Sequence, residues 1–389
     1  MSELLTSRWA ETKEALLEGL QGTKRSVMAS TLENTRKYLA ESASAGATSA
    51  GNVATLNRVI LPVIRRVMPT VIANELVGVQ PMTGPVGQIH TLRVRYSDTN
   101  GNGTGDATAG EEALSPFKIA ESYSGAAGTG KAASTAALEG AAGKRLSIQI
   151  LKQTVEAKTR KLSARWTFEA AQDAQAQQGI DIEAEIMAAL AQEITAEIDQ
   201  EILASLTTLA GSQNQQAYNQ ATVSGTATFV GDEHAALAVM INRVANVIAQ
   251  RTRRGAGNWA VVSPLALTIL QSATTSAFAR TTEGTFEAPT NTKFVGTLNN
   301  ARKVYVNTYA SSDTVLVGYK GSNESDAAAF YCPYIPLMSS GVVLDPSTFE
   351  PVVSFMTRYG YVELSNTASS LGNAADYLGT VTIANAVFS

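Results

Sequence analysis

The chain has 389 residues, of which 44% are hydrophobic and 16% are charged, and its formal net charge is -4 at pH 7. This length suffices for more than one lobe with a sizeable core. The acidic balance argues against tight nucleic-acid binding as the main task, because such proteins are usually basic. A single cysteine, Cys332, excludes an intrachain disulfide and a cysteine zinc site. Two histidines, His90 and His234, leave few choices for nucleophilic catalysis.

The N-terminal residues 1–41 have the periodicity of two amphipathic helices separated by Gly22. Such helices must bury an apolar face against a partner surface, which is often on another subunit. The Ala/Ser/Gly-rich run 42–51 is typical of a linker. The first ten residues lack a signal-peptide pattern, and no apolar run approaches the roughly 20 residues that span a bilayer. We therefore expect a protein without membrane contact that is made in a reducing cytoplasm.

Segment 56–76 is basic and apolar, and 92–96 alternates like a half-exposed strand. From 97 to 143 the chain is rich in Gly, Ala, Ser and Thr and poor in large apolar residues, so it cannot form a core of its own. A stretch this long is usually functional or lies on a neighbouring molecule. Alternation returns at 146–168, a stretch with many lysines and arginines.

The strongest helix signal follows, with large apolar residues at every fourth position from Ile182 to Ile202 and Asp181 as the N-cap. This helix is predicted to run to about Leu209, and it is strongly acidic. Like charges one turn apart repel, so basic partners are expected. The preceding basic stretch could supply them within the chain or from the next copy, unless both faces are simply solvated. The candidates are Lys158, Arg160, Lys161 and Arg165 against Glu185, Glu193, Glu197 and Glu201.

Residues 211–330 have the pattern of an α/β lobe. A helix is predicted from about Asp232 to Arg254, and Gly255 ends it. Ser263 and Pro264 are an N-cap and a first helical residue, which predicts a further helix to about Ser272. Strands are expected at 259–262, 303–307 and 314–318, and a sheet pattern punctuated by prolines closes the chain.

Two loops resemble ligand-binding motifs without completing them. Asp98, Asn100, Asn102 and Asp106 match part of a calcium loop, but Ala109 stands where a bidentate glutamate is needed, and a simple turn explains the same residues. Residues 125–131 have the spacing of a phosphate-binding loop, but they lack the following Ser or Thr and a preceding strand. The sequence therefore predicts no catalytic site, no cofactor and no metal beyond the weak calcium candidate.

Several ordered segments carry a family resemblance and together cover most of residues 60–362. They are 64–69, 78–85, 155–162, 171–173, 254–259, 317–326, 331–337 and 345–360. These segments resemble the major capsid proteins of T-even-like myophages. The resemblance implies an α+β, HK97-like capsid fold, with a peripheral domain that contains a long spine helix, an axial domain, an extended E-loop that reaches over a neighbour, and an N-terminal arm that embraces another subunit.

The resemblance also implies a division of the chain and a role for the charge pattern. The basic E-loop stem is expected to lie over the acidic spine helix of the adjacent copy. The expected parts are an N-terminal arm at 1–55, the peripheral-domain entry with the first E-loop strand at 56–96, the E-loop with a flexible tip and basic stem at 97–165, the spine helix region at 166–210, the axial domain at 211–330, closing strands at 331–362 and a C-terminal extension at 363–389.

The expected function is a structural capsid protein that forms hexamers of an icosahedral or prolate head around double-stranded DNA. The partners implied are further copies of the chain, vertex, portal, scaffold and decoration proteins, and loosely held DNA, with Arg251, Arg253 and Arg254 as possible DNA contacts. Assembly is expected in the host bacterial cytoplasm. Maturation cleavage is possible after Glu18 or Glu41, which end segments that resemble family cleavage sites. An encapsulin-like compartment shell is the alternative.

Overall fold

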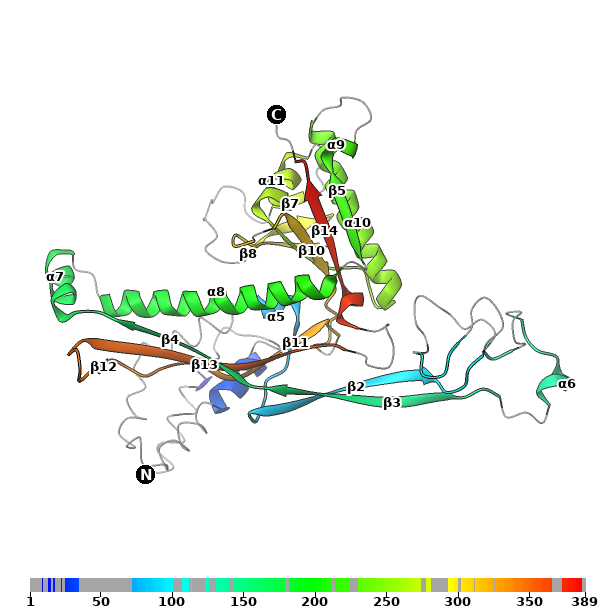
Figure 1. Ribbon diagram of the computed structural model, residues 1–389, viewed down its shortest axis with the longest axis horizontal. Coiled ribbons are helices and arrows are strands. Elements are labelled where there is room, and N and C mark those ends of the chain that lie inside the picture. The colour runs from blue at the N-terminus through cyan, green and yellow to red at the C-terminus, as the bar shows by residue number, and fades with distance from the viewer. Residues whose placement is uncertain are drawn as a thin grey trace.

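The computed structural model has an elongated platform, a two-stranded ribbon that extends from one end, and a second lobe above the platform (Figure 1). Its mixture of helices and strands confirms the α+β class. The structure describes residues 25–34, 72–100, 107–111, 123–125, 131–139, 143–178, 182–211, 214–223, 230–273, 278–280, 293–299, 302–310, 312–324, 326–365 and 373–386, together with residues 9, 13, 14, 17, 22 and 113.

The platform consists of helix α8 packed on a five-stranded sheet. α8 spans Ile182–Ala210, and Ile194, Ile198 and Ile202 lie on its fully buried face, as the four-residue spacing predicted. Each of these side chains contributes roughly 1.5–3 kcal/mol by leaving water. The sheet has the order β1-β11-β13-β12, with β4 on the second edge of β13. Its strands are β1 (Gly78–Val79), β4 (Lys158–Arg165), β11 (Ala329–Ser339), β12 (Val343–Leu344) and β13 (Pro351–Glu363).

Shorter elements frame the platform. α5 (Ala73–Leu76) leads into β1, and α7 (Phe168–Gln178) is a separate helix before α8. Asp181, the expected N-cap of α8, lies outside the described residues.

The N-terminal helical residues 25–34 pack on the same chain. Met28 and Leu32 are buried in the platform core. The side-chain amide of Asn34 donates to the carbonyl oxygens of Met82 at 2.6 Å and Tyr334 at 3.0 Å. The resemblance implied an arm that embraces another subunit, and this part of the arm instead covers its own platform, below β11 and β13 in the view of Figure 1.

The ribbon is an antiparallel pair, β2 (Val86–Tyr96) and β3 (Leu146–Glu156), in continuous register from Val86–Glu156 to Tyr96–Leu146. The short helix α6 (Thr135–Leu138) lies at its far end (Figure 1). After Ala157 the chain continues directly into β4, which pairs with β13 over its whole length. The expected basic stem at 158–165 is therefore a platform strand, because its free backbone groups find a ladder partner there, and the ribbon ends at residue 156.

The second lobe has a seven-stranded sheet of order β5-β14-β10-β6-β9-β8-β7. One face of α10 is buried in the core of this lobe, and Ser263 caps α11 by accepting from the backbone N of Ala266 at 3.2 Å. The elements are β5 (Gln215–Asn219), α9 (Gln220–Val223), α10 (Val230–Thr252), β6 (Trp259–Val262), α11 (Pro264–Ser272), β7 (Phe278–Arg280), β8 (Lys293–Leu298), β9 (Arg302–Val306), β10 (Thr314–Gly318), the 3-10 helix η1 (Ala374–Tyr377) and β14 (Leu378–Ala384).

The position of β14 corrects the expected C-terminal extension. β14 pairs antiparallel with β10 and parallel with β5, so it lies inside the sheet. Leu378 and Val381 are fully buried. The segment 373–384 is therefore an integral part of the second lobe and not an appendage, because removing it would expose the facing edges of two strands.

One ionisable group is buried where α8 meets the platform entry. Asp199 is 1% exposed, and its Oδ1 accepts a hydrogen bond from the backbone N of Ile72 at 2.9 Å. Its Oδ2 has no hydrogen-bond partner among the described residues. Burial raises the pKa of Asp199 to about 7, because the charged form loses its hydration, and the bond from Ile72 only partly opposes this effect.

We expect Asp199→Asn to raise the free energy of unfolding at neutral pH. A carboxyl group whose pKa is raised by folding stabilises the folded state fully below its unfolded pKa of about 3.9, and that stability is lost as the pH rises through about 7. Asparagine keeps the acceptor for Ile72 and cannot ionise, so the gain is up to about 4 kcal/mol. Denaturant titrations of the unassembled subunit at several pH values measure it.

The matched control is Asp173→Asn, because Asp173 is exposed on α7. The difference between Asp199→Asn and the parent protein should grow from about pH 4 to about pH 8, whereas the control should follow the parent protein. A difference that stays constant with pH would contradict the assignment.

Candidate subunit-contact surfaces

The charge pattern converges on Arg160, which joins β4 to α8. Its Nη1 lies 2.6 Å from Glu197 Oε2, its Nη2 lies 2.5 Å from Glu201 Oε2, and its Nε donates to the hydroxyl of Tyr359 at 2.6 Å. The Tyr359 hydroxyl in turn donates to Glu201. One guanidinium therefore satisfies two carboxylates one helical turn apart and a tyrosine of β13.

These contacts shift the pKa values of both partners toward the charged forms. Burial alone would lower the pKa of Arg160, but the hydrogen bonds to Glu201 and Tyr359 outweigh burial and raise it. Burial alone would likewise raise the pKa of Glu201, but the bonds from Arg160 and Tyr359 hold it below its usual value. The contact between basic strand and acidic helix thus lies within one chain, which is the first of the two alternatives that the sequence left open.

The remaining charged candidates are distributed over other faces. Along β4 every second residue is more exposed, and Lys161 and Arg165 share that exposed parity. Arg165 Nε lies 3.8 Å from Glu350 Oε2, whereas Lys158 is exposed near Glu201. No ion pair with Lys161, Glu185 or Glu193 appears in the described part of the chain. The geometry therefore leaves these three available for a contact with another copy, which stays a prediction. The charged candidates outside the Arg160 cluster are all exposed, namely Lys158, Lys161, Arg165, Glu185 and Glu193.

We expect Arg160→Gln to lower the free energy of unfolding by roughly 1 kcal/mol, because it leaves two neighbouring carboxylates uncompensated in a partly screened network. The loss should shrink at high salt, since the groups are partly exposed. The adjacent Lys161→Gln, on the opposite face of β4, is the control and should change stability by less than about 0.5 kcal/mol. Equal losses in both variants would show that Arg160 contributes no more than a surface charge.

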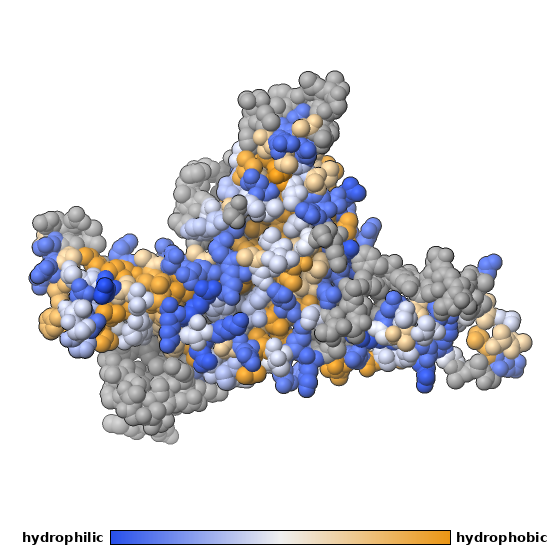
Figure 2. All heavy atoms as spheres, in the orientation of Figure 1, coloured by the Kyte–Doolittle hydropathy of each residue, from blue (hydrophilic) through white to orange (hydrophobic). Residues whose placement is uncertain are grey.

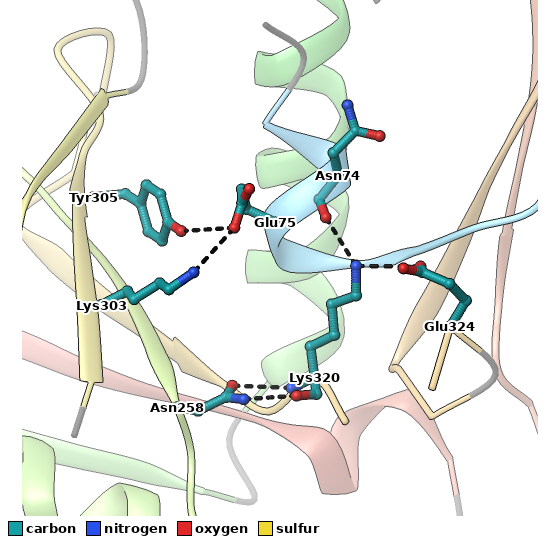
Figure 3. Close-up of polar contacts among 7 residues, drawn as sticks. All are labelled: Asn74, Glu75, Asn258, Lys303, Tyr305, Lys320 and Glu324. Atoms are coloured by element: carbon teal, nitrogen blue, oxygen red, sulfur yellow. Dashed lines mark hydrogen bonds and ion pairs between the residues drawn. The ribbon is translucent and has the colours of Figure 1, made fainter. Parts of the chain in front are cut away.

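A second polar cluster joins the platform entry to the second lobe (Figure 3). The ammonium group of Lys320 donates to the carbonyl oxygen of Asn74 at 2.8 Å and lies 3.2 Å from Glu324 Oε2. Glu324 also accepts from the backbone N of Val79 at 2.9 Å. Asn258 holds the Lys320 backbone through two bonds, of 2.6 and 3.0 Å. The cluster thus fixes the lobe against α5 and β1.

Beside this cluster, Glu75 of α5 receives two contacts from β9. The Lys303 ammonium lies 3.3 Å from Glu75 Oε2, and the Tyr305 hydroxyl donates to the same oxygen at 3.4 Å (Figure 3). Burial and the charge of Glu75 raise the pKa of Tyr305, so the tyrosine stays a donor. Two of the segments that carry the resemblance, 254–259 and 317–326, therefore meet in one joint between the lobes.

Close backbone packing explains the glycines of that joint. A Cβ added at Gly318 would overlap the indole ring of Trp259, and one at Gly257 would meet Val317. Arg254 Nη1 lies 2.7 Å from Asp326 Oδ1, and this ion pair links the two segments of the joint. Only a residue without a side chain allows β10 to approach β6 this closely.

We expect Gly318→Ala to lower the free energy of unfolding by about 1–3 kcal/mol, because the added methyl group must displace the buried Trp259 ring. Gly143→Ala is the control, since a Cβ there meets no atom within 4 Å. Tryptophan fluorescence during denaturant unfolding reports both variants. An unchanged midpoint for Gly318→Ala would contradict the close approach.

The described residues of the weak metal candidate, Asp98 and Asn100, have backbone hydrogen-bond partners. Asp98 Oδ2 accepts from the backbone N of Arg145 at 2.8 Å, and this bond holds the pKa of Asp98 below its usual value. Asn100 pairs with Ala107 in an isolated bridge. Asn102 and Asp106 lie outside the described residues, and no cluster of metal-ligating side chains occurs among the described ones.

The other motifs have structural partners. Gly125 lies against the backbone of Lys131, so the two described ends of the glycine-rich loop meet. Cys332 is a buried β11 residue, and burial raises the pKa of its thiol to about 12. His234 Nδ1 lies 2.5 Å from Ser272 Oγ, a pairing that sequence reasoning did not find because the two residues are distant in the chain. Ser272 also donates to Ile269 at the end of α11, which gives the pair a helix-capping role.

The candidate cleavage sites, Glu18 and Glu41, both lie outside the described residues. They flank the buried helical residues 25–34. A cut after Glu41 would detach this helix from the chain, whereas a cut after Glu18 would leave it attached.

No helix in the described part of the chain is long and apolar enough to cross a membrane.

Comparison with known proteins identifies the relatives. A family model described as "Major capsid protein Gp23" matches residues 53–383. A major capsid protein of Vibrio phage KVP40 is 30% identical, with 84% of this chain and 80% of that protein covered. The major capsid protein of Enterobacteria phage T4 is also 30% identical, over 83% and 78% of the two chains. The family match reaches residue 383, so it includes most of the segment that was expected as a C-terminal extension, 363–389.

Solved structures give more distant matches. "The capsid of Myoviridae Phage XM1" has a TM-score of 0.45 and 11% identity, covering 79% of this chain and 89% of that chain. A chain from Mycobacterium phage Bobi has a TM-score of 0.46 and 14% identity, covering 81% and 90%.

Proposed function

Since this chain belongs to the Gp23 major capsid protein family, we propose that it builds the head of a tailed phage from hexamers that enclose double-stranded DNA. The chain is a structural capsid protein and not an enzyme, it assembles with further copies of itself, and its place is the virion capsid. Assembly takes place in the host bacterial cytoplasm.

The projecting ribbon is the feature of the structure that supports assembly into hexamers. A two-stranded ribbon is marginally stable on its own in water, so β2 and β3 need a covering surface beyond the described chain. The ribbon and the α7 end of the platform point in opposite directions, with the second lobe between them (Figure 1). A subunit with this outline contacts one neighbour through the ribbon and another through the opposite end, and such head-to-tail contacts form a ring when the rotation between copies closes.

The contacts within the subunit reduce the three expected DNA-contact residues, Arg251, Arg253 and Arg254, to one candidate. Arg251 lies 3.6 Å from the carboxylate of Asp376, and Arg254 lies 2.7 Å from Asp326. Both cations therefore have partners within the subunit, and only the exposed Arg253 stays a candidate for a loose DNA contact. A weak contact agrees with the net acidic charge of the chain. Vertex, portal, scaffold and decoration proteins complete the set of proposed partners.

We expect native particles purified with this protein to be closed heads that protect DNA from nuclease. Negative-stain electron microscopy and DNA recovery after nuclease treatment measure the two properties. Particles that hold protein cargo in place of DNA would favour the encapsulin-like alternative. A subunit that stays monomeric under all salt and scaffold conditions would contradict the proposal.

A further inference from the structure

Arg302, the first residue of β9, is a buried cation that is held only by neutral groups. It is 7% exposed. Its Nε donates to the carbonyl oxygen of Gly257 at 2.9 Å, and its Nη1 donates to the side-chain oxygen of Asn242 on α10. Burial lowers the pKa of Arg302, and no carboxylate of the described residues opposes this effect. Buried charges are normally paired with an opposite charge, so this guanidinium lacks a counterion within the described part of the subunit.

The outer edge of the Arg302 guanidinium opens to solvent. Nη2 has no hydrogen-bond partner in the described ranges of the chain, and it is not one of the fully enclosed polar atoms. The loop that supplies the Gly257 carbonyl is itself tied to α10, because the backbone N of Gly257 donates to the carbonyl oxygen of Ala245 at 3.2 Å. The guanidinium is therefore pre-oriented, with one charged edge presented at the surface.

The surface of α10 beside Arg302 is basic. Arg243 is exposed next to Asn242, and Arg253 is exposed just beyond the end of the helix, about three turns further along. The acids of α10 stand only in its first turn, and no acid occurs from residue 234 to residue 282. Figure 2 shows hydrophilic residues on the side of the second lobe where α10 lies in Figure 1. A cationic surface with so few acids attracts anions.

We propose that Arg302, oriented by Asn242 and assisted by Arg243, binds a phosphate group. A phosphate supplies both the negative charge that the buried guanidinium lacks and the oxygen acceptors that arginine bonds most strongly. This inference rests on the proposed function, because a subunit that encloses DNA meets the phosphates of the DNA backbone. It names the α10 face of the second lobe as the face that contacts the DNA, through a contact that carries no sequence preference.

Binding of a fluorescently labelled DNA duplex to the purified full chain tests this site. Fluorescence anisotropy measures the affinity over a range of salt concentrations, and the logarithm of the binding constant falls linearly with the logarithm of the salt concentration. Arg302→Gln and Arg243→Gln should each weaken binding at low salt by about tenfold. Each should also reduce the salt slope by about one, since each removes a phosphate contact.

The matched control is Lys161→Gln, which removes one exposed positive charge from the platform and should leave the affinity and the slope unchanged. Denaturant unfolding checks that Arg302→Gln is folded. If it is not, Arg243→Gln decides, because Arg243 is exposed and its replacement disturbs no core packing.

Inorganic phosphate distinguishes a DNA backbone from a free ion as the ligand. Thermal unfolding of the parent protein and of Arg302→Gln is measured in sodium phosphate and in sodium chloride of equal ionic strength. Phosphate should raise the midpoint of the parent protein only. If it does so while the duplex binds all variants equally, the site takes a free phosphate ion and the DNA contact is wrong.

The outcomes separate this inference from the proposed function. Equal duplex affinity and equal salt slope in the parent protein and both arginine variants, together with no effect of phosphate, would overturn the site. Closed heads that still protect DNA, seen by electron microscopy and nuclease treatment, would then leave the shell function intact. If the unmodified protein forms no shells, the proposed function itself fails, whatever the duplex measurements show.

Discussion

Burial of the apolar face of α8 against the platform sheet is the interaction on which the rest of the subunit depends. The core that forms there gathers side chains from the N-terminal helix, such as Met28, from the strands β11 and β13, and from the C-terminal segment, such as Leu378. β3 continues into β4, and Arg160 of β4 is bonded to α8, so the direction of the ribbon follows from the same packing. The second lobe is fixed to this base by the joint around Lys320.

Sequence periodicity predicts well those helices that bury one apolar face and have a clear capping residue. The four-residue spacing from Ile182 to Ile202 located α8, and the capping pair Ser263 and Pro264 located α11. Asp199 is one of the acids of this helix, but it stands next to Ile198 and four residues after Thr195, on the buried side of α8. Its helical position was therefore a signal that it points into the core.

Pairing between distant segments could not be predicted in the same way. The alternation at 158–165 suits a ribbon stem and a sheet strand equally, and only the ladder with β13 decides between them. The insertion of β14 between β5 and β10 joins segments that are far apart in sequence, and a strand pattern alone does not state its partner. The resemblance supplied the family and the general outline, whereas the partners of Arg160, Asp199 and Gly318 became visible only in the structure.

The charge cluster around Arg160 is paired within the subunit and so does not depend on assembly. Arg160, Glu197 and Glu201 satisfy one another inside the subunit, so they stabilise the platform before any neighbour arrives. Exposed large apolar residues include Leu146, Ile148 and Ile150 on the ribbon and Phe168 and Phe349 at the opposite end of the platform. A rigid subunit with two unlike ends can form a repeating contact without a change of fold, which is what a shell made of many identical chains requires.

A cryo-electron microscopy reconstruction of assembled particles tests the central claim most directly. The account predicts α8 on its own sheet in every subunit, with the ribbon of each subunit covered by a neighbouring subunit. A ribbon folded back on its own platform, or an α8 that exchanges its sheet with a neighbour, would contradict the account.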